Sequence, residues 1–284
     1  MRFLKRPASV GRFAALTAAL AASPAFAQSS TTPAAQASAN TSTNTNTFDD
    51  TWRYSLGFGV FETPKYQGSS ATKFQPAPIV GVSYGRYFFG SVADASVPFG
   101  LGAFLYRDDH FRVGVALSYD LVTPRDSSDD FRLRGLPDIN RTLHATLFGS
   151  YNRDWLSVVG AVSQDVAGEK EGATASLDLF GRYSPASKWM LSAGPGITFG
   201  SAEYNDTYFG ISPQNSARSG LNSYSPGAGV TALRMTASAT YLLSRHWNLG
   251  TRIVATKLPG AVGNSPVVEK KTQMTYGVFA GYAF

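Results

Sequence analysis

The last segment of the chain, residues 272–284, alternates between two kinds of side chain. From Met274 to Phe284 every even position is apolar or aromatic, while the odd positions are small or polar except for Phe279. A period of two places successive side chains on opposite faces of a β-strand. At about ten residues or slightly more, the segment is long enough to cross a bilayer as a tilted strand. An edge strand of a soluble β-sandwich would show the same pattern, so this segment alone leaves both interpretations open.

The same alternation recurs from residue 51 onward and predicts about twelve strands. They cover, approximately, residues 52–61, 74–84, 87–95, 99–106, 111–119, 141–151, 155–164, 172–183, 189–199, a segment ending near 243, 247–255 and 272–284. Every second connection, beginning after the second strand, has about two to five residues, and most of the others are longer. Short turns at one rim and long loops at the other are typical of outer-membrane barrels, whose short turns face the periplasm.

The aromatic residues follow a second pattern that agrees with the first. They gather at the strand ends that flank the short turns: Trp52, Tyr54, Tyr84, Tyr87, Tyr106, Phe111, Tyr151, Trp155, Tyr183, Trp189, Tyr241, Trp247 and Tyr282. Such a ring is typical of the aromatic girdle at a membrane interface. Because lipid offers no partner to backbone donors, the first strand must pair with the last. The sequence therefore predicts an all-β protein, an antiparallel transmembrane β-barrel over residues 51–284, with short periplasmic turns, long external loops and outer-membrane lipid around it.

Residues 1–27 have the features of a cleavable secretory signal peptide. The apolar run 13–22 precedes the small-x-small cleavage site Ala25-Phe26-Ala27 and follows basic residues at Arg2, Lys5, Arg6 and Arg12. Residues 28–50 are rich in Ser, Thr, Ala and Asn and lack apolar periodicity, which predicts a flexible periplasmic leader. We therefore expect a protein that is exported to the outer membrane of a Gram-negative cell.

The charge balance excludes a nucleic-acid partner. The formal net charge of +6 includes the four basic residues of the signal peptide. Without those four, the 25 basic residues fall to 21, against 19 acidic residues. A balance this close to neutral supplies no basic tract for phosphate backbones.

The aromatic carboxyl terminus is similar to the terminal signal of bacterial outer-membrane barrels. Phe284 is the last residue, and Tyr276 and Tyr282 precede it on the same face of the last predicted strand. We expect these three residues to form the assembly signal that the barrel assembly machinery reads.

Charged residues also occur on the face that would line the lumen of the barrel. With the apolar face turned to lipid, the lumen receives Arg53, Arg112, Asp178, Arg182, Arg234 and Arg252. One hypothesis is a basic constriction that favours anions in a small channel. The other is a filled barrel in which the arginines pair with Asp178 and with loop carboxylates. Twelve strands are too few to guarantee an open channel, so we favour the filled barrel.

The residues that could carry catalysis are dispersed. Gly81 to Gly85 match the G-x-S-x-G pattern, but the pattern ends one predicted strand and a second strand follows after a two-residue turn, whereas the nucleophile elbow needs a strand followed by a helix. His110, His144 and His246 are far apart and have no metal-ligand spacing. The chain contains no cysteine, which excludes disulfides and thiolate sites. The sequence therefore predicts no enzyme, metal site or cofactor; a membrane lipid hydrolase using Ser83 and His144 is the less favoured alternative.

Motifs in the long loops resemble the MipA/OmpV family of outer-membrane proteins. The stretch Arg134-Gly135-Leu136-Pro137-Asp138-Ile139 is similar to the family's R-G-L-x-D-I motif. Three further stretches follow in the family's order, and they contain Tyr208, Phe209 and Gly210, then Ser219 and Gly220, then Ser265 and Pro266. The chain departs from the family at residues 259–263, where members often have an acidic G-D-A run.

The resemblance implies a non-enzymatic scaffold or interaction protein. Members hold a lytic transglycosylase, which is a murein hydrolase, together with a bifunctional murein synthase; others are described as adhesins or are linked to permeability. These enzymes are the partners that the resemblance implies here. Loop residues such as Tyr208, Phe209, Ile211 and Leu221 are too apolar for freely moving loops, so we expect the loops to fold inward and shape or plug the lumen.

Overall fold

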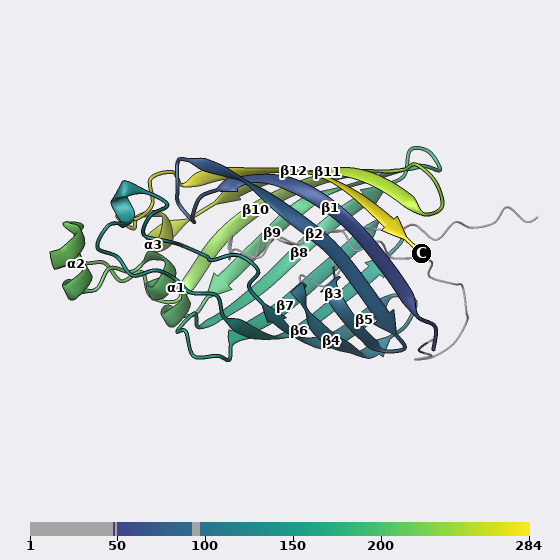
Figure 1. Cartoon of the computed structure of the whole chain (residues 1–284), viewed down its shortest axis with the longest axis horizontal. Coiled ribbons are helices and arrows are strands. Elements are labelled where there is room, and N and C mark those ends of the chain that lie inside the picture. Colours follow the sequence, from purple (N-terminus) through teal and green to yellow (C-terminus); the bar gives the residue numbers. More distant parts are fainter. Residues whose placement is uncertain (1–47, 49, 93–96) are drawn as a thin grey trace, which may run out of the picture.

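The computed structural model describes residues 48, 50–92 and 97–284, which form a closed antiparallel barrel of twelve strands (Figure 1). The predicted fold class is confirmed, while the predicted signal peptide and nearly all of the predicted leader lie outside the described residues. The strands are β1 (Arg53–Pro64), β2 (Thr72–Tyr84), β3 (Tyr87–Val92), β4 (Val97–Arg107), β5 (Phe111–Tyr119), β6 (Leu143–Arg153), β7 (Leu156–Asp165), β8 (Ala173–Tyr183), β9 (Trp189–Gly200), β10 (Gly229–Leu242), β11 (Trp247–Lys257) and β12 (Thr272–Ala283).

The barrel closes where the first strand meets the last. β1 pairs with β12 in a continuous register in which Leu56 lies opposite Tyr282 and Val60 opposite Val278. The period of two separates the faces as predicted: Val278 is 60% exposed on the outer surface, whereas its neighbour Phe279 is 5% exposed. Every strand is then paired with a neighbouring strand on both sides, as a lipid environment demands. In the described part of the chain, no helix has the length and apolar character to cross a membrane.

The connections sort between the two rims. Residues 85–86, 108–110, 154–155, 184–188 and 243–246 join strands at one rim, where the carboxyl end also lies (Figure 1). Residues 65–71, 120–142, 166–172, 201–228 and 258–271 join strands at the other rim. The helices α1 (Ala202–Phe209), α2 (Pro213–Ser219) and α3 (Gly260–Gly263) all belong to this second rim (Figure 1). By the rule for outer-membrane barrels, the short-turn rim is the periplasmic one.

Aromatic residues at the short-turn rim contact one another across neighbouring strands. The rings of Trp52 and Tyr84 lie 4.8 Å apart, and those of Trp247 and Tyr282 lie 5.0 Å apart. Their outward faces are exposed, with Trp52 at 57%. This arrangement is that of an interfacial girdle, in which amphipathic rings stabilise the barrel at the boundary between lipid and water.

Large aromatic side chains fill the interior against glycines. A Cβ at Gly250 would lie 2.0 Å from the ring of Phe279, and one at Gly277 would lie 2.2 Å from the ring of Phe61. On the other side of the barrel the rings of Phe88, Phe104 and Phe148 pack within 6.0 Å of one another. The glycines that occur on the inner face therefore make room for the rings that lie over them.

The long loops pack together over the second rim, and we call residues 65–71, 120–142, 201–228 and 258–271 the cap. Its apolar residues form two buried clusters, one with Ile139, Tyr204, Tyr208, Phe209, Leu258 and Val262, the other with Tyr66, Leu133, Leu136, Ile211 and Val267. Tyr208, Phe209 and Ile211 are thus buried and Leu221 packs half-buried against the second cluster, while α1 lies against β8, β9 and β10. The cap is a small packed core that rests on the barrel.

Candidate functional site

The family-like motifs hold the cap together. The buried Arg125 donates from Nη1 to the Tyr208 carbonyl (2.9 Å) and from Nη2 to the Pro137 carbonyl (3.1 Å), and burial lowers its pKa to about 10. The Ser265 hydroxyl donates to the Phe209 carbonyl at 2.6 Å. Three motifs that are far apart in the sequence therefore meet through backbone carbonyls. Such bonds fix the loops with respect to one another because each satisfies a buried polar group.

The glycines and polar residues of these motifs shape the loops locally. Gly135 has a φ of +84° and a Cβ there would lie 2.7 Å from the Arg218 carbonyl oxygen. Gly220 ends α2 in the left-handed conformation, with a φ of +73°. Three further motif residues act on nearby backbone: Gly210 donates to Asp206, Asp138 accepts from Ser127 and Ser219 donates to Asn215. Leu136 and Ile139 are buried, Pro266 is half-buried and Arg134 is exposed.

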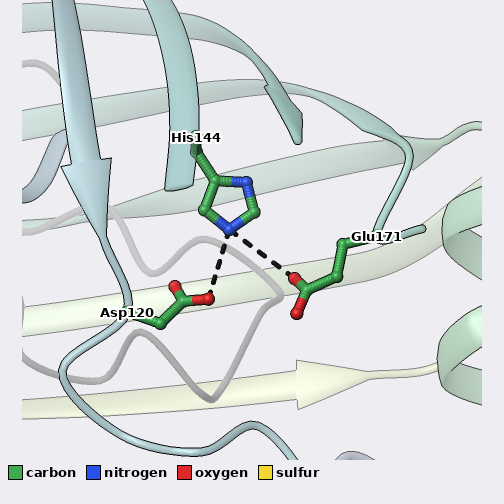
Figure 2. Close-up of side chains that lie close together, drawn as sticks. All are labelled: Asp120, His144 and Glu171. Atoms are coloured by element: carbon green, nitrogen blue, oxygen red, sulfur yellow. Dashed lines mark hydrogen bonds and ion pairs between the residues drawn. The ribbon is translucent and has the colours of Figure 1, made fainter. Parts of the chain in front are cut away.

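Where the cap meets the barrel, the structure brings together three ionisable residues that the spacing of the sequence did not reveal (Figure 2). His144 Nε2 lies 3.3 Å from Asp120 Oδ2 and 3.5 Å from Glu171 Oε2. Asp120 and Glu171 are each 1% exposed and His144 is 6% exposed. We call Asp120, His144 and Glu171 the buried triad.

Neighbouring donors orient the two carboxylates of the buried triad. The Tyr208 hydroxyl, from α1, donates to Glu171 Oε2 at 2.7 Å, and the Thr142 backbone amide donates to Asp120 Oδ2 at 3.1 Å. Burial, and then the negative charge of Asp120, raises the pKa of Glu171 to about 7. Burial, and then the charge of Glu171, raises the pKa of Tyr208 well above its ordinary value. The tyrosine therefore serves as a hydrogen-bond donor to the carboxylate.

The topology explains why these residues meet. Asp120 follows the last residue of β5, His144 is the second residue of β6 and Glu171 is the penultimate residue of the loop between β7 and β8. In an antiparallel barrel these strand ends lie side by side at one rim, and His144 pairs with Ser118 on β5 and with Asp165 on β7. The buried triad could have been predicted from the sequence if the pairing register of the four strands β5 to β8 had been assigned, with the long loops placed at one rim.

The charged residues predicted for the lumen occupy two levels of the barrel. Arg234 and Asp178 form a buried ion pair in which Nη2 of Arg234 donates to both carboxylate oxygens, at 2.8 and 2.9 Å. Arg252 is 3% exposed, and within the described residues its guanidinium has no hydrogen-bond partner. The other three arginines, Arg53, Arg112 and Arg182, lie near the short-turn rim. There Arg182 donates a hydrogen bond to the Ser157 hydroxyl at 2.8 Å. The ion pair between Asp178 and Arg234 is of the kind that the filled-barrel hypothesis predicts, in which lumen arginines pair with Asp178.

The residues of the hydrolase alternative lie at opposite ends of the barrel. Ser83 is the penultimate residue of β2, beside the short turn at 85–86, and its partner in β1 is Arg53. His144 lies at the long-loop rim. A serine nucleophile and its base must be within hydrogen-bond distance, so these two residues do not form a catalytic pair.

The terminal aromatic residues lie along the outer face of β12. Tyr276 is 45% exposed and Phe284 is 63% exposed, and the Phe284 amide donates to the Tyr54 carbonyl at 3.1 Å. The rings of Tyr282 and Phe284 lie 4.8 Å apart in an edge arrangement. Their role as an assembly signal stays a prediction.

The closed barrel, with its aromatic girdle and its sorted loops, defines an outer-membrane β-barrel protein. The chain belongs to the family described as MltA-interacting protein MipA, whose model matches residues 56–284. The resemblance seen in the loop motifs is thereby confirmed.

Individual relatives are distant. The MltA-interacting protein of Escherichia coli strain K12 is 24% identical over 219 residues, which cover 77% of this chain and 85% of that protein. The outer membrane protein Omp26La of Vibrio anguillarum is 25% identical over 212 residues, 73% of each chain. Among solved structures, an outer membrane channel from Pseudomonas putida F1 has a TM-score of 0.46 at 14% identity, covering 82% of this chain and 95% of that one.

Proposed function

We propose that this protein is a non-enzymatic outer-membrane scaffold that binds murein-remodelling enzymes, a lytic transglycosylase and a murein synthase. The observation that carries the proposal is the occupied interior: inward residues at mid-barrel, such as Arg252 and Phe279, are 3% and 5% exposed. A barrel with buried inner side chains at mid-height, and with packed loops over its long-loop rim, leaves little lumen for a solute, so we infer that it works through its surfaces. The Escherichia coli relative is named as an interaction partner of MltA, which supports the same role here.

The docking surface in this proposal is the short-turn rim, because murein enzymes work in the periplasm. Each of the five described short connections has a basic residue in it or beside it: Arg86, Arg107, Arg153, Lys188 and Arg245. Four of these are exposed and Arg107 is half-buried. The acidic residues of the same turns are Asp108, Asp109 and Asp154, and Asp108 is engaged by the Tyr106 hydroxyl at 2.7 Å. A ring of basic residues favours a partner with an acidic face.

Charge reversal at the short turns is expected to release the partner. We expect a variant with Arg86→Glu, Arg153→Glu and Arg245→Glu to recover at least tenfold less murein hydrolase from detergent extracts than the wild type, because like charges then face each other. The measurement is the muramidase activity that co-purifies with equal amounts of folded barrel. The matched control, Arg134→Glu, Arg218→Glu and Lys270→Glu, reverses as much charge at exposed positions on the opposite rim. Equal recovery from both variants, or no murein enzyme with the wild type, would contradict the proposal.

In the proposed scaffold the barrel conducts few ions, and planar bilayers test this against the channel alternative. We expect the purified protein to give no steady conductance, since charged and aromatic side chains occupy the lumen and the cap covers one rim. A steady anion-preferring conductance whose selectivity reverses in Arg112→Glu and Arg182→Glu variants would favour the channel. Export by the predicted signal peptide and recognition of Phe284 by the barrel assembly machinery complete the proposal.

A further inference from the structure

We propose that the buried triad of Asp120, His144 and Glu171 binds one divalent transition-metal ion of the zinc class (Figure 2). One donor atom from each residue lies within 4.8 Å of the other two. The imidazole lies above the two carboxylates, which approach it from opposite sides in the view of Figure 2. This site is independent of the scaffold function, because it lies at the rim that faces away from the proposed partner.

The donor spacing fits such an ion. The imidazole nitrogen lies 3.3 Å from the Asp120 oxygen and 3.5 Å from the Glu171 oxygen. Around a tetrahedral zinc ion with bonds of about 2.0–2.2 Å, adjacent donors are roughly 3.3–3.6 Å apart. Two of the three donor pairs therefore already have the separation that the ion requires, and the third pair, formed by the two carboxylate oxygens, lies within 4.8 Å.

A buried carboxylate oxygen of Glu171 is available to a ligand. The side chain of Glu171 is fully buried and directed at His144, yet within the described residues its Oε1 has no hydrogen-bond partner. The hydroxyl of Ser118, the cross-strand neighbour of His144, is likewise buried and without a partner in the described part of the chain. Buried polar groups in native proteins are almost always satisfied, so this carboxylate oxygen is available to a bound ion or to the water that accompanies one.

The charges of the site favour a cation. Asp120 and Glu171 are both buried, and the only ion pair of Glu171 within the described residues is the one with His144. The carboxylate of Asp165, at the adjacent end of β7, adds a third negative charge nearby. A divalent ion would balance the two carboxylates directly and would leave imidazole as a neutral nitrogen ligand.

The ligand set and its surroundings narrow the choice of ion. One imidazole and two carboxylates are a donor set that zinc and its neighbours accept with three protein ligands, whereas calcium takes six to eight oxygens. Tyr208 and Thr142 already hold the two carboxylates in place by hydrogen bonds. Such outer donors tune metal affinity, and because Tyr208 belongs to α1, the ion would connect the cap to the barrel wall.

Zinc titration of the full-length, refolded protein tests the site. After removal of metals with a chelator, we expect calorimetry to show one saturable Zn²⁺ per wild-type barrel. Glu171→Gln should weaken this binding at least tenfold because it removes a ligand. Tyr208→Phe should weaken it by about tenfold to a hundredfold, because it removes only the hydrogen bond to that ligand. The control Glu169→Gln changes an exposed carboxylate in the same loop and should bind as the wild type does.

A second measurement separates this site from adventitious binding at the surface. Zn²⁺ should slow trypsin cleavage at the buried Arg125 of the cap in the wild type and in Glu169→Gln, but not in Glu171→Gln. The shift in gel mobility between unheated and heated samples checks that each variant is a folded barrel. The absence of saturable Zn²⁺ binding to the wild type, or equal affinity of Glu171→Gln and Glu169→Gln, would overturn the proposal.

Discussion

Replacing Asp178 with alanine is expected to lower the free energy of unfolding by about 3–5 kcal/mol, since it removes one partner of a buried ion pair. Asp178 is 1% exposed and accepts two hydrogen bonds from Arg234, and Arg252 lies close enough to interact electrostatically with the same carboxylate. Without it, two buried guanidinium groups lose the carboxylate with which both interact. The measurement is urea unfolding in phospholipid vesicles, followed by the fluorescence of the four tryptophans.

Two companion variants determine whether the buried charge is the cause. In the Asp178→Ala background, Arg234→Met and Arg252→Met should restore much of the lost stability, because apolar replacements of buried ion pairs are often neutral or stabilising. Gly196→Ala should be destabilising without any change of charge, because its Cβ would lie 1.8 Å from the Asp178 carboxylate. Gly160→Ala is the matched control, since the Cβ there would make ordinary contacts at 3.6 and 3.8 Å. Unfolding of Asp178→Ala at the wild-type urea concentration would contradict this account of the lumen.

The barrel could be predicted from the sequence because three patterns depend on the membrane alone. Lipid requires apolar side chains on one face of every strand, and this requirement produces the alternation of apolar and polar residues seen in β12. It also requires a closed sheet, so the pairing of β1 with β12 followed once the even number of strands was known. The third pattern, the aromatic girdle, marked which strand ends lie at an interface. None of these patterns depends on the contacts of a particular residue.

The cap was only partly predictable. Apolar loop residues such as Phe209 and Ile211 indicated that the loops would be buried, but α1 and α2 were not foreseen. Both helices are short, and their signals are local: Ser201 and Ser212 accept from the amides of Tyr204 and Asn215 as N-caps. A single serine before a turn of helix is common in loops, so these signals are weak without the packing that the cap supplies.

The buried triad could not be read from spacing, because its members lie 24 and 27 residues apart in the chain. Their proximity follows from strand register, which the alternation constrains only to the choice of face. The lumen arginines show the same limit. Alternation identified Arg234, Arg252 and Asp178 as inward-facing, yet only the register places Asp178 opposite Gly196 and within reach of Arg234.

Replacing Phe209 with alanine is expected to open the cap while the barrel stays folded. Phe209 is completely buried in a cluster with Tyr204 and Tyr208, and truncating such a ring costs about 3–5 kcal/mol. The cap consists of loops that rest on the barrel, so this loss should appear as local opening of the cap, which raises the population of the open state about a hundredfold or more. Trypsin cleavage after Arg125 reports the opening, because that side chain is 4% exposed and bonded to the Tyr208 carbonyl in the closed cap.

The control for this variant is Phe131→Ala, which removes the same ring from a position in the cap that is 70% exposed. It should leave the rate of cleavage after Arg125 within about twofold of the wild type, because an exposed ring contributes little packing. For both variants the shift in gel mobility on heating should persist, since the twelve strands do not depend on the cap for their hydrogen bonds. Equal cleavage rates in the two variants would show that Phe209 does not hold the cap closed. Loss of the mobility shift in Phe209→Ala would show that the cap and the barrel fold as one unit. That outcome is expected if the buried triad joins the cap strongly to the barrel even without a metal ion.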